Sequence, residues 1–187
     1  MTSAFSPDDR TGHDAIEVSQ PKPRHGVVAG TVLHAARWSA VLSTTHLALA
    51  AGVIEAVVLS WEAGTSPLTS VPMPQIEQLE DALRAARAEH RLVADFAVAI
   101  WCDLVIQAIT DGEDTDCLLA DPLAGEDAFG ELLAWCIADE RPARYQPFTP
   151  PGRLLRAAGL PLVAAIVHIL EAVGRIRIEP PRDAGRP

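Results

Sequence analysis

Aromatic residues are scarce in this chain, which has four Trp, four Phe and one Tyr among 187 residues. β-Branched residues are also too few to favour a large sheet, whose faces depend on both kinds of side chain. Hydrophobic residues nevertheless make up 49% of the chain, which is enough to fold around one core. The composition therefore argues against a disordered protein and favours helices over sheets.

Long uninterrupted apolar runs are missing as well. Polar residues break the three most apolar stretches, at Glu55, at Asp95 and Asp103, and at His168 and Glu171. A membrane-spanning helix needs about 20 predominantly apolar residues, and the polar N-terminus has no signal-peptide core. We therefore expect a cytoplasmic protein that does not enter a membrane.

Cysteine is rare, and Cys102, Cys117 and Cys136 match no zinc-binding spacing. The sequence also has no phosphate-binding glycine loop and no nucleophile elbow. We expect Cys102 and Cys136 to be buried thiols and Cys117 to be a loop thiol in a reducing compartment. No cofactor is predicted.

Positive charge is in short supply, because 15 Lys and Arg face 25 Asp and Glu and the formal net charge is −10. Such a chain repels phosphate backbones, which disfavours nucleic acid as a partner. The acids concentrate in residues 111–127, but their spacing is not that of an EF-hand calcium loop. A solvated charge run accounts for them, and the Arg-rich residues 149–187 leave room for a basic patch.

Two long spans contain no proline, from Arg24 to Ser66 and from Gln75 to Asp121. Proline is nearly excluded from helix interiors, so these spans predict long helices over residues 31–62 and 74–110. We expect an all-α protein, a helical bundle of four to five helices built on these two central helices.

The remaining segments follow from the prolines and glycines. They predict an acidic loop over 111–125, a helix over 126–139, a proline-rich connector over 142–151, a final helix broken at 159–161, and a short strand or wing over 175–179. We expect one domain over 26–179, a disordered tail over 1–25 and a second tail over 180–187.

Helical phase suggests which polar residues of the first central helix face water. Arg37, Thr44, Glu55 and Glu62 are spaced so that they fall on one narrow stripe of a single helix. This stripe is the expected solvated edge. His46 lies almost opposite the stripe, so we expect it to be buried.

The second central helix has its own polar residues of interest. His90 falls in the middle of an apolar face, and Asp103 falls beside Phe96 and Ala99. Asp95, in contrast, falls on the same side as the polar, solvent-exposed face of the first half of this helix. We therefore expect Asp103 to be a buried carboxylate and Asp95 to be solvated.

His46, His90 and Asp103 are thus the best candidates for a ligand site or a polar core. Metal and acid–base sites in bundles are built from such inward side chains on facing helices. A structural network, in which each buried polar group finds a hydrogen-bond partner, explains them more simply. The sequence leaves both readings open and assigns no catalytic residue.

A weaker alternative is a metal site formed by Glu55, Asp95, His168 and Glu171. The order His168-x-x-Glu171 is the reverse of the Glu-x-x-His motif of carboxylate-bridged metal bundles, and it occurs once. A solvated stripe with a Glu171–Arg175 ion pair at i, i+4 explains the same residues. We therefore expect no metal.

Residues 53–64 and 92–104 resemble the all-α nucleoside triphosphate pyrophosphatases of the MazG type. Glu55 and Asp95 are similar to two acids of that family's metal-binding helices, but the neighbouring acids of the pattern are absent. A two-Mg²⁺ site needs several carboxylates to offset its charge. The resemblance implies a metal-dependent pyrophosphatase-like protein that is degenerate.

Residues 154–178 resemble a winged helix, with residues 162–173 as the recognition helix. The resemblance implies a DNA-associated regulator. The recognition helix offers His168 and Glu171 as its polar groups, whereas base edges are read by Arg, Lys, Asn, Gln or Ser. Such a domain would pack against protein rather than read DNA.

The interpretation that fits best is a non-enzymatic helical protein that binds a ligand or another protein. The first central helix is apolar around most of its circumference, and the shorter helices cannot cover it fully. Uncovered apolar surface on a soluble protein marks an interface. We expect a homodimer, or contact with another protein, near Trp38, Trp61 or Trp101.

Overall fold

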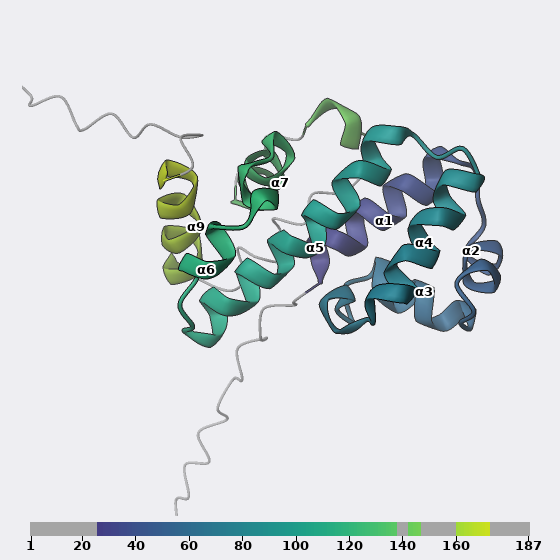
Figure 1. Ribbon diagram of the computed structural model, residues 1–187, viewed down its shortest axis with the longest axis horizontal. Helices are drawn as coiled ribbons and strands as arrows, with labels where there is room; N and C mark the ends of the chain where they lie inside the picture. Colours follow the sequence, from purple (N-terminus) through teal and green to yellow (C-terminus); the bar gives the residue numbers. More distant parts are fainter. Residues whose placement is uncertain (1–25, 138–141, 147–159, 173–187) are drawn as a thin grey trace, which may run out of the picture.

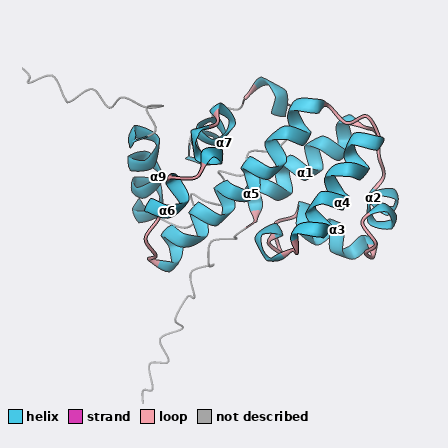
Figure 2. Ribbon diagram, in the orientation of Figure 1, coloured by secondary structure: helices cyan, strands magenta, loops and turns pink. Residues whose placement is uncertain are grey.

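The computed structural model describes residues 26–137, 142–146 and 160–172, and every regular element in these ranges is a helix (Figures 1 and 2). The α-helices are α1 (Val27–Ser39), α2 (Thr44–Ala50), α3 (Glu55–Glu62), α4 (Met73–Ala85), α5 (His90–Asp111), α6 (Asp116–Leu119), α7 (Asp127–Ile137) and α9 (Leu160–Ala172). Short 3-10 helices are η1 (Leu68–Ser70), η2 (Pro122–Gly125) and η3 (Ala143–Tyr145). The all-α class is confirmed. The expected tails and the strand at 175–179 lie outside the described residues.

Helix α5 is the centre of the fold and packs against α1, α4, α7 and α9. In Figure 1 it crosses the middle of the molecule, with α1 to α4 toward one end and α6, α7 and α9 toward the other. Its buried side chains include Phe96, Ala99, Cys102 and Ile106. These residues recur at helical spacing and join the two ends of the molecule through one core.

Helices α1 and α5 run antiparallel. The carboxylate of Asp103, late in α5, accepts hydrogen bonds at the start of α1, and the Ser39 hydroxyl at the end of α1 accepts one from the Glu89 amide just before α5. The two polar contacts therefore fix both ends of this helix pair.

The single helix expected over residues 31–62 is wrong, because three helices occupy this span. Ser43 begins α2, since its side chain accepts a hydrogen bond from the His46 amide. Gly52, with a φ of 66°, ends α2, and the axes of α2 and α3 then differ by 110°. The predicted helix is therefore interrupted at two places, and neither interruption contains a proline.

The single helix expected over residues 74–110 is also wrong, because α4 ends at Ala85 and α5 begins at His90. Arg87 between them is left-handed, with a φ of 60°. Pro74 does lie in the first turn of α4, and Gly112 does end α5, as expected. The predicted loop over 111–125 contains α6 and η2.

Five helix ends share one geometry, in which a residue one or two positions after the helix is left-handed and the next amide bonds to the carbonyl five residues back. The left-handed residues, in chain order, are Val41, Gly52, Gly64, Arg87 and Gly112. The matching amide donors are Leu42, Val53, Thr65, Ala88 and Glu113. This is the Schellman motif, which favours glycine because a Cβ is strained there.

Helices α1 and α3 approach each other closely at Gly30. A Cβ on Gly30 would lie 2.2 Å from the carbonyl oxygen of Trp61. The absence of a side chain therefore permits this crossing. The contact holds the α2–α3 hairpin against the first helix.

Candidate functional site

The structure does not gather His46, His90 and Asp103 into one core. His46 lies in the first turn of α2 and is exposed, with its Nδ1 2.8 Å from the Ser43 hydroxyl. His90 is the first residue of α5 and is exposed as well. The expected burial of both histidines is wrong, because each lies beside a helix boundary that the sequence reading missed.

Asp103 is buried, as expected, with 1% of its surface exposed. Its Oδ1 accepts a hydrogen bond from the Val28 amide at 3.1 Å, and its Oδ2 accepts one from the Ala29 amide at 2.8 Å. Gly26 at the start of α1 supplies no capping side chain, and the first turn has no acid. Asp103 therefore caps α1 from α5 and satisfies two amides that have no partner within their helix.

Burial raises the pKa of Asp103 to about 7, and hydrogen bonds from the amides of Ala29, Val28 and Gly26 work in the opposite direction. Burial likewise raises the pKa of the Cys102 and Cys136 thiols, neither of which is in a disulfide. The expected burial of Cys102 and Cys136 is confirmed, whereas Cys117, expected in a loop, is exposed on the short helix α6. A protonated thiol in a dry core is a packing group and a poor nucleophile.

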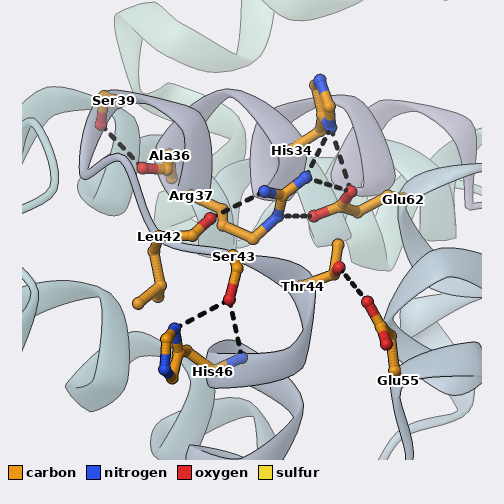
Figure 3. A network of polar contacts seen from close by, with 10 residues as sticks. All are labelled: His34, Ala36, Arg37, Ser39, Leu42, Ser43, Thr44, His46, Glu55 and Glu62. Atoms are coloured by element: carbon orange, nitrogen blue, oxygen red, sulfur yellow. Dashed lines mark hydrogen bonds and ion pairs between the residues drawn. The ribbon is translucent and has the colours of Figure 1, made fainter.

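Arg37, Glu62 and His34 form an ion-pair cluster between α1 and α3 (Figure 3). Arg37 donates from Nε to Glu62 Oε1 at 2.5 Å, from Nη2 to Glu62 Oε2 at 2.8 Å and from Nη1 to the Leu42 carbonyl at 2.8 Å. His34 Nδ1 lies 3.0 Å from Glu62 Oε2. The same His34 Nδ1 also lies 3.2 Å from Arg37 Nη2, so this ring nitrogen faces both a carboxylate oxygen and a guanidinium donor.

The ion pair of this cluster is mostly enclosed, since 8% of the Glu62 side chain and 11% of the Arg37 side chain are exposed, whereas 43% of the His34 side chain is exposed. Burial alone would raise the pKa of Glu62, but hydrogen bonds from Arg37 and His34 outweigh it and the pKa lies below its usual value. The hydrogen bond to Glu62 raises the pKa of Arg37. Chemically, the cluster is a bidentate ion pair with an attached imidazole, and it fastens three chain segments together.

The expected solvated stripe therefore pairs across helices. Arg37 on α1 bonds Glu62 on α3, and the Thr44 hydroxyl on α2 bonds the Glu55 carboxylate on α3 (Figure 3). The four residues are neighbours because the chain folds back on itself, and one continuous helix does not contain them. The expectation that Arg37 and Glu62 face water is wrong, because the two side chains form an enclosed ion pair.

Asp95 is buried, which contradicts the expected wet face. Its Oδ2 accepts hydrogen bonds from Arg144 Nε at 2.5 Å and from the Tyr145 hydroxyl at 2.6 Å, and Arg144 also donates to Glu131 Oε2 at 2.5 Å. The Tyr145 ring stacks on Trp135 with centroids 4.9 Å apart. These contacts join η3 to α5 and α7. Burial and the bond to Asp95 raise the pKa of Tyr145.

The four residues of the weaker metal alternative are engaged in separate places. Glu55 bonds Thr44, and Asp95 bonds Arg144 and Tyr145. His168 and Glu171 lie on α9 with Nδ1 and Oε2 3.9 Å apart, and the His168 side chain is 86% exposed. Within the described ranges, no three His, Cys, Asp or Glu residues are placed to hold a metal ion.

The large apolar side chains that are exposed to solvent belong to one stretch of the sequence. Among the described residues, all the exposed ones lie between positions 38 and 73: Trp38, Val41, Leu49, Ile54, Leu59 and Met73. We call them the 38–73 surface. Of the three tryptophans expected to be uncovered, Trp38 is exposed, but Trp61 is buried and Trp101 is partly buried with its N–H bonded to Leu118.

Three of these side chains surround the turn between α2 and α3. Leu49, Ile54 and Met73 are 79%, 71% and 68% exposed. The Gln75 amide donates to the Ala51 carbonyl at 3.4 Å, which holds the start of α4 beside this turn. Val41 and Trp38 flank the other end of α2, at the α1–α2 turn. The exposed apolar side chains thus belong to the end of α1, the α1–α2 turn, the α2–α3 hairpin and the start of α4.

One described helix, α5, meets the length and apolarity of a membrane span, and more than half of that stretch is buried inside the protein. Helices α2 and α3 meet the criterion only when they are joined as one bent span. A buried core helix of a soluble protein meets the same criterion. The burial of α5 therefore accounts for its composition.

The sequence reading missed His34, Arg144 and Tyr145. Nothing in their local sequence marks them, because each acts on a group distant in the chain: Glu62 for His34, and Asp95 for the other two. Comparison with protein-family models, curated proteins and solved structures finds no match for this chain.

Proposed function

We propose that this chain is a non-enzymatic interaction protein that associates with itself through the 38–73 surface. The observation that carries the proposal is the confinement of every exposed large apolar side chain of the described residues to this one stretch. Large exposed apolar patches mark interaction sites on soluble proteins, and we infer that these side chains form such a patch. The polar clusters around Asp103, Glu62 and Asp95, in contrast, are engaged in joining helices.

Charge supports a second copy as the partner. Residues 38–73 contain two formally charged side chains, Glu55 and Glu62, in a chain of net charge −10. Glu62 is turned inward onto Arg37, so the surface carries one acid, which is itself bonded to Thr44. Two acidic molecules repel each other least where their charge is lowest, and interface cores are depleted of charge.

The energetics are adequate for a dimer. Full burial of one Leu, Ile or Met side chain contributes roughly 1.5–3 kcal/mol. A symmetric contact buries each of Leu49, Ile54 and Met73 twice, once from each copy. Part of this gain offsets the entropy lost on association, which costs at least about 4 kcal/mol. A few fully buried side chains at the centre are enough for a measurable dimer.

The test is the mass of the full chain in solution. Light scattering at micromolar concentration should give twice the 20.0 kDa of one chain. Ile54→Glu should weaken the dimer by at least about tenfold, because it places a charge at the centre of the contact. Ala120→Glu is the matched control, since it adds the same charge at an exposed position just after α6. A monomer at all concentrations, or equal effects of both variants, would refute the proposal.

A further inference from the structure

Val41 occupies a position that its side chain disfavours. It follows the C-terminus of α1 with a φ of 52°, in the left-handed region. Its amide donates to Trp38, and the next amide, from Leu42, donates to Arg37, which completes the Schellman motif. A β-branched residue in this conformation is strained, because its Cβ approaches the backbone too closely.

At three of the other four helix ends of this kind, the left-handed residue is glycine. Helices α2, α3 and α5 end on Gly52, Gly64 and Gly112, and glycine adopts this conformation without strain. Helix α4 ends on Arg87, whose straight side chain is tolerated better than a branched one. Val41 is thus the one β-branched residue among the five.

The strain at Val41 is not offset within the described fold. The residue is 94% exposed, so its methyl groups gain almost nothing from packing in the single chain. Strained residues persist where the surrounding structure or a function requires them. The backbone hydrogen bonds around Val41 would form equally well with glycine. The side chain itself is therefore what needs an explanation.

We propose that Val41 is a specificity-determining contact of the dimer, and that the α1–α2 turn docks into a second copy of this chain. This inference rests on the proposed function and adds the contact that selects the partner. Val41 and Trp38 are the part of the 38–73 surface that lies at the α1–α2 turn, and the sequence has no formally charged side chain between positions 38 and 54. The matching surface is the same apolar, nearly neutral face of another copy.

The decisive variant is Val41→Gly, because folding and association should respond in opposite directions. Glycine relieves the left-handed strain, so the Tm of the monomer should rise by about 1–4 °C. The dimer dissociation constant should rise at least about tenfold, since a buried side chain is lost from both copies. The Tm is measured at a concentration low enough for the monomer to dominate, because dimerisation adds its own stability.

Arg87→Gly is the matched control. It relieves the same backbone conformation at the end of α4, so it should raise the Tm similarly and leave the dissociation constant unchanged. Val41→Ile, which keeps a branched apolar side chain, should retain the dimer and the strain. These three variants separate the shape of the turn from the side chain that it carries.

Each outcome bears on one of the two proposals. If the wild-type chain dimerises and Val41→Gly leaves its dissociation constant unchanged, the role of Val41 is wrong while the dimer stands. If the wild-type chain is monomeric, both proposals fail. Neutral phosphatidylcholine vesicles serve as a further probe, because binding to them by the wild-type chain but not by Val41→Gly would assign the turn to a lipid surface and overturn the docking proposal.

Discussion

Asp103→Ala tests the buried cap of α1. The substitution leaves the amides of Val28 and Ala29 without their acceptors in a region where both residues are fully buried. Each orphaned amide costs about 1–3 kcal/mol, which predicts a loss of roughly 2–6 kcal/mol before other effects. The removal of a buried carboxylate recovers part of this cost, because an ionised group is disfavoured in the core.

The free energy recovered by removing the carboxylate depends on pH, so the effect of Asp103→Ala should differ between acidic and alkaline conditions. The pKa of Asp103 rises from 3.8 to about 7 on folding, so its contribution is fully present at low pH and is lost as pH rises through 7. For these two values, the wild-type chain should lose about 2–3 kcal/mol of stability from this group between pH 5 and pH 8. Asp103→Ala should therefore be more destabilising at pH 5 than at pH 8.

Denaturant unfolding followed by circular dichroism at both pH values provides the measurement. Glu113→Ala serves as the control, because it removes an exposed acid near the end of the same helix. Unchanged midpoints for Asp103→Ala at both values would show that the cap is not needed. An equal loss at both values would contradict the raised pKa and leave the hydrogen bonds as the whole effect.

Two further substitutions probe other contacts. Gly30→Ala should lower the free energy of unfolding by about 1–3 kcal/mol despite the better helix propensity of alanine, because its Cβ would meet the Trp61 carbonyl oxygen at 2.2 Å. A thermal melt at or above that of the wild type would contradict this crossing. Tyr145 is the one tyrosine of the chain, so an alkaline absorbance titration follows it alone, and it should ionise above the usual tyrosine pKa. An ordinary tyrosine titration in the folded chain would contradict its burial against Asp95.

The sequence supports correct predictions where a helix is continuous. Asp103 was placed correctly because its phase was set by Phe96 and Ala99, which lie on the same helix. His46 was misplaced because its phase was measured from Arg37, across the end of α1 and the start of α2. The prediction that Asp95 is solvated was wrong for the same reason, since the solvent-exposed face was extrapolated from residues of α4. A helical phase holds only between the caps of one helix.

Some of these breaks were visible in the sequence and others were not. Ser43 is a good N-cap residue, and Gly52 is a good helix terminator, so the first predicted helix could have been divided from the sequence. Val41 and Arg87 carry no such signal, because both stop a helix in a conformation that their residue types disfavour. The partner of Asp103 was also out of reach, since 75 residues separate it from Val28.

The inward charge and the outward apolar side chains of the 38–73 surface have one explanation if the chain dimerises there. A soluble monomer would gain by exposing Glu62 and burying Val41, and this chain does the reverse. An unpaired acid at the centre of an interface is costly, and the bonds to Arg37 and His34 that hold Glu62 inward leave Glu55 as the one outward acid of residues 38–73. In such a dimer, the ion-pair cluster of α1 and α3 would serve the contact indirectly, by removing from the surface a charge that a second copy would have to desolvate.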